Sequence, residues 1–120
     1  MKKILFLFTV LVVSMVSCKK EKTNPPVKQY KVKYGIGCTD CTVIYYYDAN
    51  GNDTIEYHKN SSWIYSFTGK PGLPLILFAY NTSGTPQDVT ATISLNDTVL
   101  STQTSYCPIN GSVLCTDTIP

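Results

Sequence analysis

Apolar and polar residues alternate along most of the chain after residue 27, and short turn signals interrupt the alternation. Between Asp88 and Leu95, for example, Val, Ala, Ile and Leu alternate with Asp, Thr and Ser. A period of two residues is typical of a β-strand with one buried and one solvated face, and no long stretch shows the period of a helix. The pattern predicts strands over residues 29–36, 42–47, 53–58, 63–68, 75–81, 88–95, 98–106 and 111–115.

The turn residues predict how some of these strands pair. Asn50-Gly51 favours a two-residue type I′ hairpin, because both residues accept a positive φ. Such a turn places Tyr46 opposite Ile55, and the alternation then gives one apolar face and one mixed face. We expect the apolar face in the core: Ile44, Tyr46, Ile55 and Tyr57.

Two further hairpins are predicted at Asn96-Asp97 and Asn110-Gly111. Seven or eight short strands over about 90 residues are typical of an immunoglobulin-like antiparallel β-sandwich. The predicted fold class is therefore all-β. We expect the sandwich domain over residues 28–116 and a short tail over residues 117–120.

The beginning of the chain has the composition of an export leader. Lys2 and Lys3 precede an apolar run over residues 4–16. As a helix this run spans about 20 Å, less than the roughly 30 Å hydrocarbon core of a bilayer, so it predicts a signal peptide over residues 1–17. The Ser17-Cys18 pair that follows resembles the lipobox of bacterial lipoproteins. The resemblance implies cleavage before Cys18 and lipidation of that residue; a plain secretory leader is the alternative.

Residues 18–27 are polar and charged and include Pro25-Pro26, so we expect a flexible tether between the lipidated Cys18 and the domain. Its lysines either lie against anionic headgroups or are solvated. The segment has no acidic run of the kind that some Gram-negative lipoproteins use for export to the cell surface. We therefore expect a lipid-anchored protein of the cell envelope, in the outer membrane with its domain in the periplasm.

The formal charge of the whole chain, +2, comes from its N-terminal end. After the leader and the tether, five Lys face seven Asp and Glu, and the chain contains no Arg. Such a domain has no basic patch for nucleic acid and no guanidinium fork for phosphates. We expect no nucleic-acid partner.

Beyond Cys18 the chain has four cysteines: Cys38, Cys41, Cys107 and Cys115. An even number in a small exported domain predicts two disulfides, and we favour the local pairs Cys38–Cys41 and Cys107–Cys115 over the crossed pairings. The C-x-x-C spacing also fits a zinc knuckle or a thiol redox site. A structural disulfide is favoured because a strand and not a helix follows, and because the compartment is oxidising.

The order of strands and turns resembles the MmpS family over residues 30–115. The matching stretches are 30–35, 43–51, 63–68, 75–81 and 92–100, followed by Cys115. The resemblance implies an exported β-sandwich with an accessory role beside MmpL exporters of the resistance-nodulation-division class. The chain departs from the family in having Cys18 in place of a transmembrane helix and an additional Cys38-Cys41 pair. In the family, the last cysteine pairs with a cysteine at the position where this chain has Ala91. In this chain Cys107 is the cysteine available for that role.

Candidate catalytic chemistry is sparse. His58 is the only histidine, and no nucleophile elbow or phosphate-binding loop accompanies it. Residues 48–53 begin like a calcium loop, but Asp53 replaces the required Gly and Lys59 stands where the final acid would be. We predict no enzymatic activity, no cofactor and no metal site.

Nine tyrosines are many for a chain of this length. On the mixed face of the hairpin at Asn50-Gly51, three residues form a candidate ligand face for a carbohydrate or a small apolar molecule: Tyr45, Tyr47 and His58. Ordinary sheet packing is the alternative, because Tyr favours strands. Three hypotheses follow: an accessory or scaffold protein of the envelope with a partner such as a transporter, a ligand-binding module, and a thiol redox protein through Cys38 and Cys41.

Three Asp-Thr pairs are each followed by a β-branched apolar residue, at Thr54, Thr98 and Thr118. The pattern resembles a periplasmic O-glycosylation motif of one Gram-negative phylum, which implies modification of the Thr. The alternative is that Asp-Thr pairs suit hairpin ends. We expect Thr118 to be the most accessible of the three, because it falls in the predicted tail.

Overall fold

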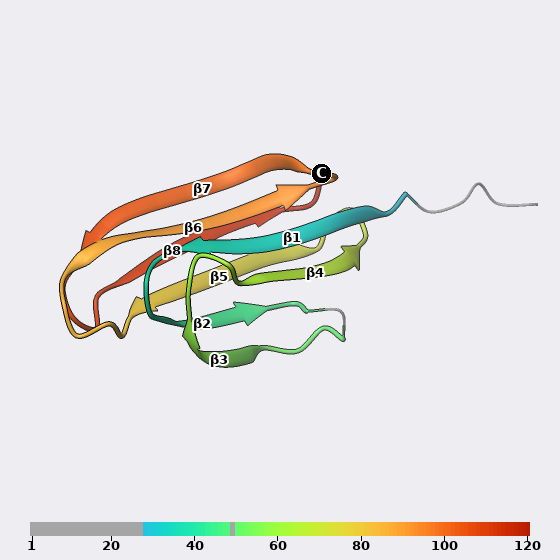
Figure 1. Ribbon diagram of the computed structural model, residues 1–120. Coiled ribbons are helices and arrows are strands. Elements are labelled where there is room, and N and C mark those ends of the chain that lie inside the picture. Colours follow the sequence, from blue (N-terminus) through green and yellow to red (C-terminus); the bar gives the residue numbers. More distant parts are fainter. Residues whose placement is uncertain (1–27, 49) are drawn as a thin grey trace, which may run out of the picture.

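The computed structural model describes residues 28–48 and 50–120, so the predicted signal peptide, Cys18 and the tether lie outside the described residues. The described chain forms eight strands: β1 (Tyr30–Gly37), β2 (Cys41–Tyr46), β3 (Thr54–Lys59), β4 (Ile64–Gly69), β5 (Pro74–Asn81), β6 (Gln87–Leu95), β7 (Thr98–Cys107) and β8 (Ser112–Thr118). They make two four-stranded antiparallel sheets, β4-β1-β6-β7 and β3-β2-β5-β8 (Figure 1). Within the described part no helix is long and apolar enough to span a membrane.

The predicted antiparallel β-sandwich is confirmed. Burial alternates strictly along the central strands, as in β1, β2, β5 and β6. A strand places successive side chains on opposite faces, so the alternation read from the sequence becomes an inside and an outside for each sheet. Every predicted strand is present, with ends that differ by at most a few residues.

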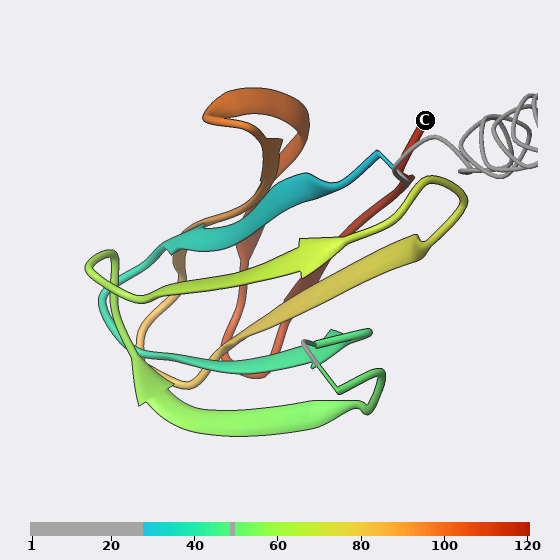
Figure 2. The same cartoon turned by 90° about the vertical axis from the view of Figure 1, so that its right-hand side faces the viewer.

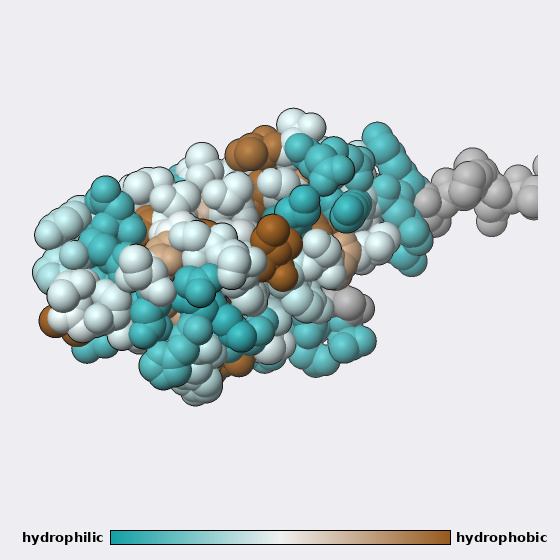
Figure 3. All heavy atoms as spheres, viewed as in Figure 1, coloured by the Kyte–Doolittle hydropathy of each residue, from teal (hydrophilic) through white to brown (hydrophobic). Residues whose placement is uncertain are grey.

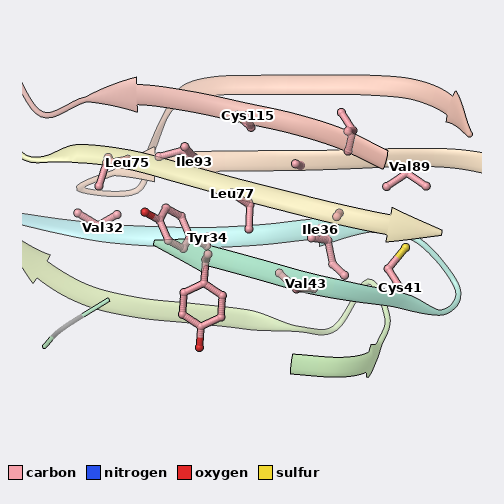
Figure 4. Close-up of a cluster of buried hydrophobic side chains, with 14 of the residues drawn as sticks. Val32, Tyr34, Ile36, Cys41, Val43, Leu75, Leu77, Val89, Ile93 and Cys115 are labelled. Carbon is pink, nitrogen blue, oxygen red and sulfur yellow. The ribbon is translucent and has the colours of Figure 1, made fainter. Parts of the chain in front are cut away.

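The inner faces of both sheets form one hydrophobic core. Fully buried residues come from four central strands and from β8: Val32, Tyr34, Cys41, Val43, Leu75, Leu77, Ala79, Val89, Ala91, Ile93 and Cys115. Their side chains project into the space between the sheets (Figure 4). The phenol of Tyr34 donates a hydrogen bond to the Tyr46 carbonyl at 3.0 Å. Burial raises the pKa of Tyr34 above its ordinary value.

The chain passes repeatedly between the two sheets, since only β2–β3 and β6–β7 are hairpins within one sheet. At the passage from β1 to β2, Cys38 and Cys41 form a disulfide with a Cα–Cα distance of 6.3 Å. Ser61, in the loop before β4, is hydrogen-bonded to the backbone of Cys38. Its Oγ accepts a hydrogen bond from the Cys38 N–H at 3.0 Å and donates one to the Cys38 carbonyl at 3.1 Å.

A single polar side chain, Asn81, is fully buried among the described residues. Its Nδ2 donates to the carbonyls of Thr85 and Cys107 at 2.8 and 3.1 Å. Its Oδ1 accepts from Ser83 Oγ and Gln87 Nε2 at 2.6 and 3.1 Å. These bonds satisfy the buried amide and hold the passages from β5 to β6 and from β7 to β8 together.

The predicted register of the β2–β3 hairpin is wrong. Ile44 lies opposite Ile55, and Tyr45 lies opposite Thr54, so the loop is longer than two residues. Asp48 organises this loop, because its Oδ1 accepts backbone N–H groups at 2.9 and 3.1 Å, and these bonds lower the pKa of its carboxyl. A shift of two residues keeps Ile44 and Ile55 on one face, but the expectation that this face lies in the core is wrong: Tyr45 on the other face is only 3% exposed, whereas Ile55 is 49% exposed.

The prediction of a Cys107–Cys115 disulfide is also wrong. Asn110-Gly111 does not close a hairpin but connects the two sheets, so Cys107 lies opposite Gln87 in one sheet and Cys115 opposite Leu77 in the other. The Cys115 Sγ lies 3.4 Å from the Oγ of Ser101. Ser101 is about 20 Å along β7 from Cys107, far beyond disulfide reach. Both thiols are free and buried.

Residues 117–120 do not form the predicted tail. β8 continues to Thr118, which pairs with Pro74. Ile119 is 1% exposed and donates its N–H to the Leu73 carbonyl at 3.0 Å. The apolar side chain of Ile119 draws the end of the chain into the core. The C-terminus therefore lies at the same end of the sandwich as the start of β1 (Figures 1 and 2).

Candidate functional site

The outer face of the β3-β2-β5-β8 sheet is apolar. One row of directly paired residues crosses all four strands: Ile55, Ile44, Phe78 and Leu114. A second row contains Tyr46, Ile76 and Thr116, and a third contains Thr42, Tyr80 and Ser112. Tyr57 adds a ring on β3 that is 65% exposed. We call the surface formed by these residues the apolar face.

The apolar face carries no charged side chain in any of its three rows. Its aromatic centre is ordered, because the rings of Phe78 and Tyr80 stack with centroids 6.1 Å apart and planes 16° apart. Four strands about 4.8 Å apart and three rows about 7 Å apart give roughly 400 Å² of sheet surface. The row from Ile55 to Leu114 is apolar throughout, and the rows on either side end in Thr or Ser; apolar patches rimmed by polar residues are commonly binding surfaces.

The outer face of the β4-β1-β6-β7 sheet is built differently, and we call it the polar face. Its central row is Ile64, Gly35, Thr92 and Thr102. Hydroxyl pairs join Thr90 to Thr104 at 2.9 Å and Thr92 to Thr102 at 3.1 Å. Seen from the side on which β1 and β6 pass in front of β8, the surface carries only isolated apolar patches (Figure 3).

A shallow groove of about 400 Å³ crosses the polar face. Gly35 forms part of its floor, and a Cβ added there would meet no atom within 4 Å. Ile64 and Thr92 stand on either side, and Lys33 stands at one end, where its Nζ lies 3.1 Å from Asp97. Three polar side chains of the groove are already bonded to residues outside it: Lys33 to Asp97, Thr90 to Thr104, and Thr92 to Thr102.

The candidate ligand face of Tyr45, Tyr47 and His58 does not form. Tyr45 belongs to the core, where its hydroxyl donates to Glu56 Oε2 at 2.6 Å. Burial, followed by the bond to Glu56, raises the pKa of Tyr45. Tyr47 follows the end of β2 with a φ of 58°, and His58 is exposed with its Nδ1 3.1 Å from Asp40 Oδ1. The three side chains therefore share no surface.

The position of the Cys38–Cys41 disulfide fits a structural role. Cys38 is 6% exposed and Cys41 is fully buried. Exchange requires a thiolate to reach a sulfur along the S–S axis, and burial of both residues blocks that approach. The location at the crossing between sheets fits the structural interpretation of the C-x-x-C pair.

The three Asp-Thr sites differ in access. The hydroxyl of Thr54 donates to Asp48 Oδ2 at 3.2 Å and is half-buried. Thr98 is exposed directly after the Asn96-Asp97 turn, where both turn residues have positive φ as predicted. Thr118 is exposed at the end of β8. Modification of these residues stays a prediction.

No group of three or more His, Cys, Asp or Glu side chains converges as a metal site in residues 28–48 and 50–120. Residues 50–53 turn back toward Asp48, which accepts the Gly51 N–H through its carbonyl and the Asn50 N–H through Oδ1. No protein-family model matches the chain, and no curated protein matches its sequence. The function is therefore argued from the surfaces that the chain itself presents.

Sequence reasoning placed four residues of the apolar face, Ile44, Tyr46, Ile55 and Tyr57, in the core, and so missed this face as a surface. Both faces of β2 and β5 are apolar in sequence, so alternation alone does not say which one is inside. A polar residue distinguishes the inner face from the outer one. The Glu56 carboxylate accepts hydrogen bonds from the Tyr45 hydroxyl and the Trp63 indole. Those bonds require Tyr45 to point inward, and Ile44 and Ile55 then point outward.

Proposed function

We propose that this chain is a lipid-anchored envelope protein without enzymatic activity, which serves as an accessory or scaffold and binds an envelope protein partner through the apolar face. The leader and the Ser17-Cys18 pair support the anchor, and the MmpS-like order of strands supports an export assembly as the setting. The observation that carries the binding role is the row Ile55, Ile44, Phe78 and Leu114 across the whole outer sheet.

The chemistry of the face favours a protein partner with an uncharged apolar surface. A charged partner surface would lose hydration against these rows and gain no opposite charge in return. A roughly 400 Å² face is about half of what one partner buries in a standard stable interface, so the expected contact is modest in affinity. The membrane tether compensates for this modest affinity, because two proteins held to one membrane meet at high effective concentration.

The experiment is crosslinking of the full lipidated protein in its own membrane, followed by identification of the adducts. Two face variants, Ile55→Lys and Leu114→Lys, are compared with Thr102→Lys on the polar face. All three replace an exposed outer-face residue, so we expect the folded state to persist in each.

A transporter or adaptor subunit that is captured by the parent chain and by Thr102→Lys, and lost with both face variants, would support the proposal. Capture that is equal for all four proteins would overturn the role of the apolar face. Recovery of glycan, or of nothing but bulk lipoproteins, would overturn the accessory role and favour the ligand-binding alternative. A Cys18→Ser chain that stays on the membrane would overturn the lipid anchor.

A further inference from the structure

The sandwich has four edge strands, and they are not protected alike. β7 and β8 lie against each other at one side, with more contacts than any other pair of strands from opposite sheets. β3 carries Glu56 and Lys59, and His58 within it has a φ of 54° that bends the strand. Charges, bends and coverage are the usual devices by which proteins prevent an edge from pairing with another chain.

β4 has none of these devices. Its sequence, Ile-Tyr-Ser-Phe-Thr-Gly, contains no charged residue and no Pro. Its pairing with β1 runs without a break from Tyr30 opposite Gly69 to Gly35 opposite Ile64. Within the described part of the chain, β4 pairs with β1 alone, so its other edge presents backbone N–H and C=O groups at strand spacing.

The side of the sandwich next to β4 is aromatic. The Tyr45 ring lies 4.7 Å from Tyr65 and 5.5 Å from Trp63, measured between centroids. Glu56 Oε2 accepts the Trp63 indole N–H at 3.2 Å and so fixes that ring at the boundary of β4. Half-buried rings therefore border β4 where the two sheets separate.

We propose that the edge of β4 is a second binding surface that takes an extended segment of a partner protein as an added strand. Backbone groups at strand spacing are matched only by another strand, which fixes the class of ligand. Side chains of the added strand alternate between two environments. Those on the inner side meet Tyr65 and Trp63, and those on the outer side continue the line of Ser66 and Thr68, so the segment alternates apolar and small polar residues.

This inference does not rest on the apolar face, because β4 belongs to the other sheet. The probe is a short synthetic peptide of alternating valine and threonine with lysines at its ends, together with the same peptide methylated on its backbone nitrogens. The measurement is hydrogen exchange of the β4 amides in the full chain in detergent. At a peptide concentration ten times its Kd, we expect about tenfold slower exchange of the β4 amides that point away from β1.

The methylated peptide lacks the N–H donors, so it should leave exchange unchanged. Ser66→Lys and Thr68→Lys place a charge on the edge without touching the core and should abolish the slowing. Thr104→Lys, on the same outer face but on β7, should retain it. Thermal unfolding of each variant identifies any that fails to fold, and Thr68→Lys serves if Ser66→Lys does fail.

The proposal is overturned if the unmethylated peptide leaves the β4 amides unchanged, or if the methylated peptide slows them equally. It is also overturned if Ser66→Lys and Thr68→Lys both keep the slowing, or if the peptide slows the β7 amides in place of the β4 amides, because the peptide would then not lie along the β4 edge. Loss of partner capture by Leu114→Lys would not affect this result, so the two proposals fail separately.

Discussion

The two outer faces of the sandwich occupy equivalent positions and carry opposite chemistry. The central row of the apolar face is Ile55, Ile44, Phe78 and Leu114. The central row of the polar face is Ile64, Gly35, Thr92 and Thr102. Both rows lie outside the core, on sheets with the same number of strands. The difference therefore does not come from the demands of the sandwich.

The polar face places threonine hydroxyls, glycine and lysine against water, and its exposed apolar side chains, Ile64, Val99 and Tyr106, lie apart from one another among them. The apolar face differs, because folding leaves its apolar side chains partly in contact with water. These side chains therefore gain less free energy from burial than those of the core. Their free energy is available to a contact made after folding. The comparison is thus between a face suited to solvent and a face that we propose to be suited to a partner.

The largest expected effect contrasts one residue type inside and outside the same sheet. Leu77 is fully buried on β5, and Leu114 is 47% exposed on β8. Leu77→Ala should lower the free energy of unfolding by about 3 kcal/mol, because it removes buried methyl groups and leaves a cavity. Leu114→Ala should lower it by less than about 1 kcal/mol. Urea unfolding of both variants measures the difference, and equal losses would mean that the apolar face is part of the core.

The next effect concerns the link between the sheet with the polar face and the sheet with the apolar face. Removing the Cys38–Cys41 disulfide with Cys38→Ala and Cys41→Ala together should cost about 2 kcal/mol, because the closed loop is short. Thermal unfolding with and without reductant checks the value. Since the staple is structural, the parent protein should resist alkylation under native conditions. Rapid native alkylation after mild reduction would revive the redox hypothesis.

The strands could be predicted from the sequence because the alternation is local. The Asn96-Asp97 hairpin was predictable for the same reason, since both residues adopt the positive φ that the turn requires. The predictions that failed concern features that depend on contacts between distant parts of the chain. Asn110-Gly111 looks like a hairpin turn, but Asn81 binds the Cys107 carbonyl and directs the chain into the other sheet. No spacing within β7 and β8 reveals that partner.

The prediction of the candidate ligand face failed for a related reason. The observed β2–β3 register differs from the predicted one by two residues, so the same side chains still share a face, and the error lies in which face was expected to be buried. Because Val43 and Ile44 are equally apolar, the sequence pattern does not choose between them. The choice comes from Glu56, whose carboxylate accepts hydrogen bonds from Tyr45 and Trp63 and draws Tyr45 inward.

Alkaline pH should weaken the interior of the sandwich. Burial raises the pKa of the Tyr34 and Tyr45 phenols and of the Cys115 thiol, so the folded state favours their neutral forms. Their contribution to stability is complete below the unfolded pKa values, about 8.5 for a thiol and about 10 for a phenol, and is lost as the pH rises above them. Urea unfolding should show a free energy that falls from about pH 9 upward.

Tyr34→Phe is the control for this pH effect. It removes the hydrogen bond to the Tyr46 carbonyl, which should cost about 1 kcal/mol at neutral pH. It also removes one ionising group, so the decline above pH 10 should be shallower than in the parent chain. An unchanged slope would assign the alkaline loss to groups other than Tyr34.

The smallest expected effect comes from exchanging chemistry between the two faces. Thr92→Val removes a solvent-exposed hydroxyl pair with Thr102, and Ile44→Thr places a hydroxyl in the apolar row. Each should change the free energy of unfolding by less than about 1 kcal/mol, because β-branched residues suit strands and neither position is in the core. Their effects on binding should differ, with capture of the membrane partner reduced by Ile44→Thr and unchanged by Thr92→Val. A large loss of stability in Ile44→Thr would show that the apolar row supports the fold, and the distinction between the two faces would then be one of packing.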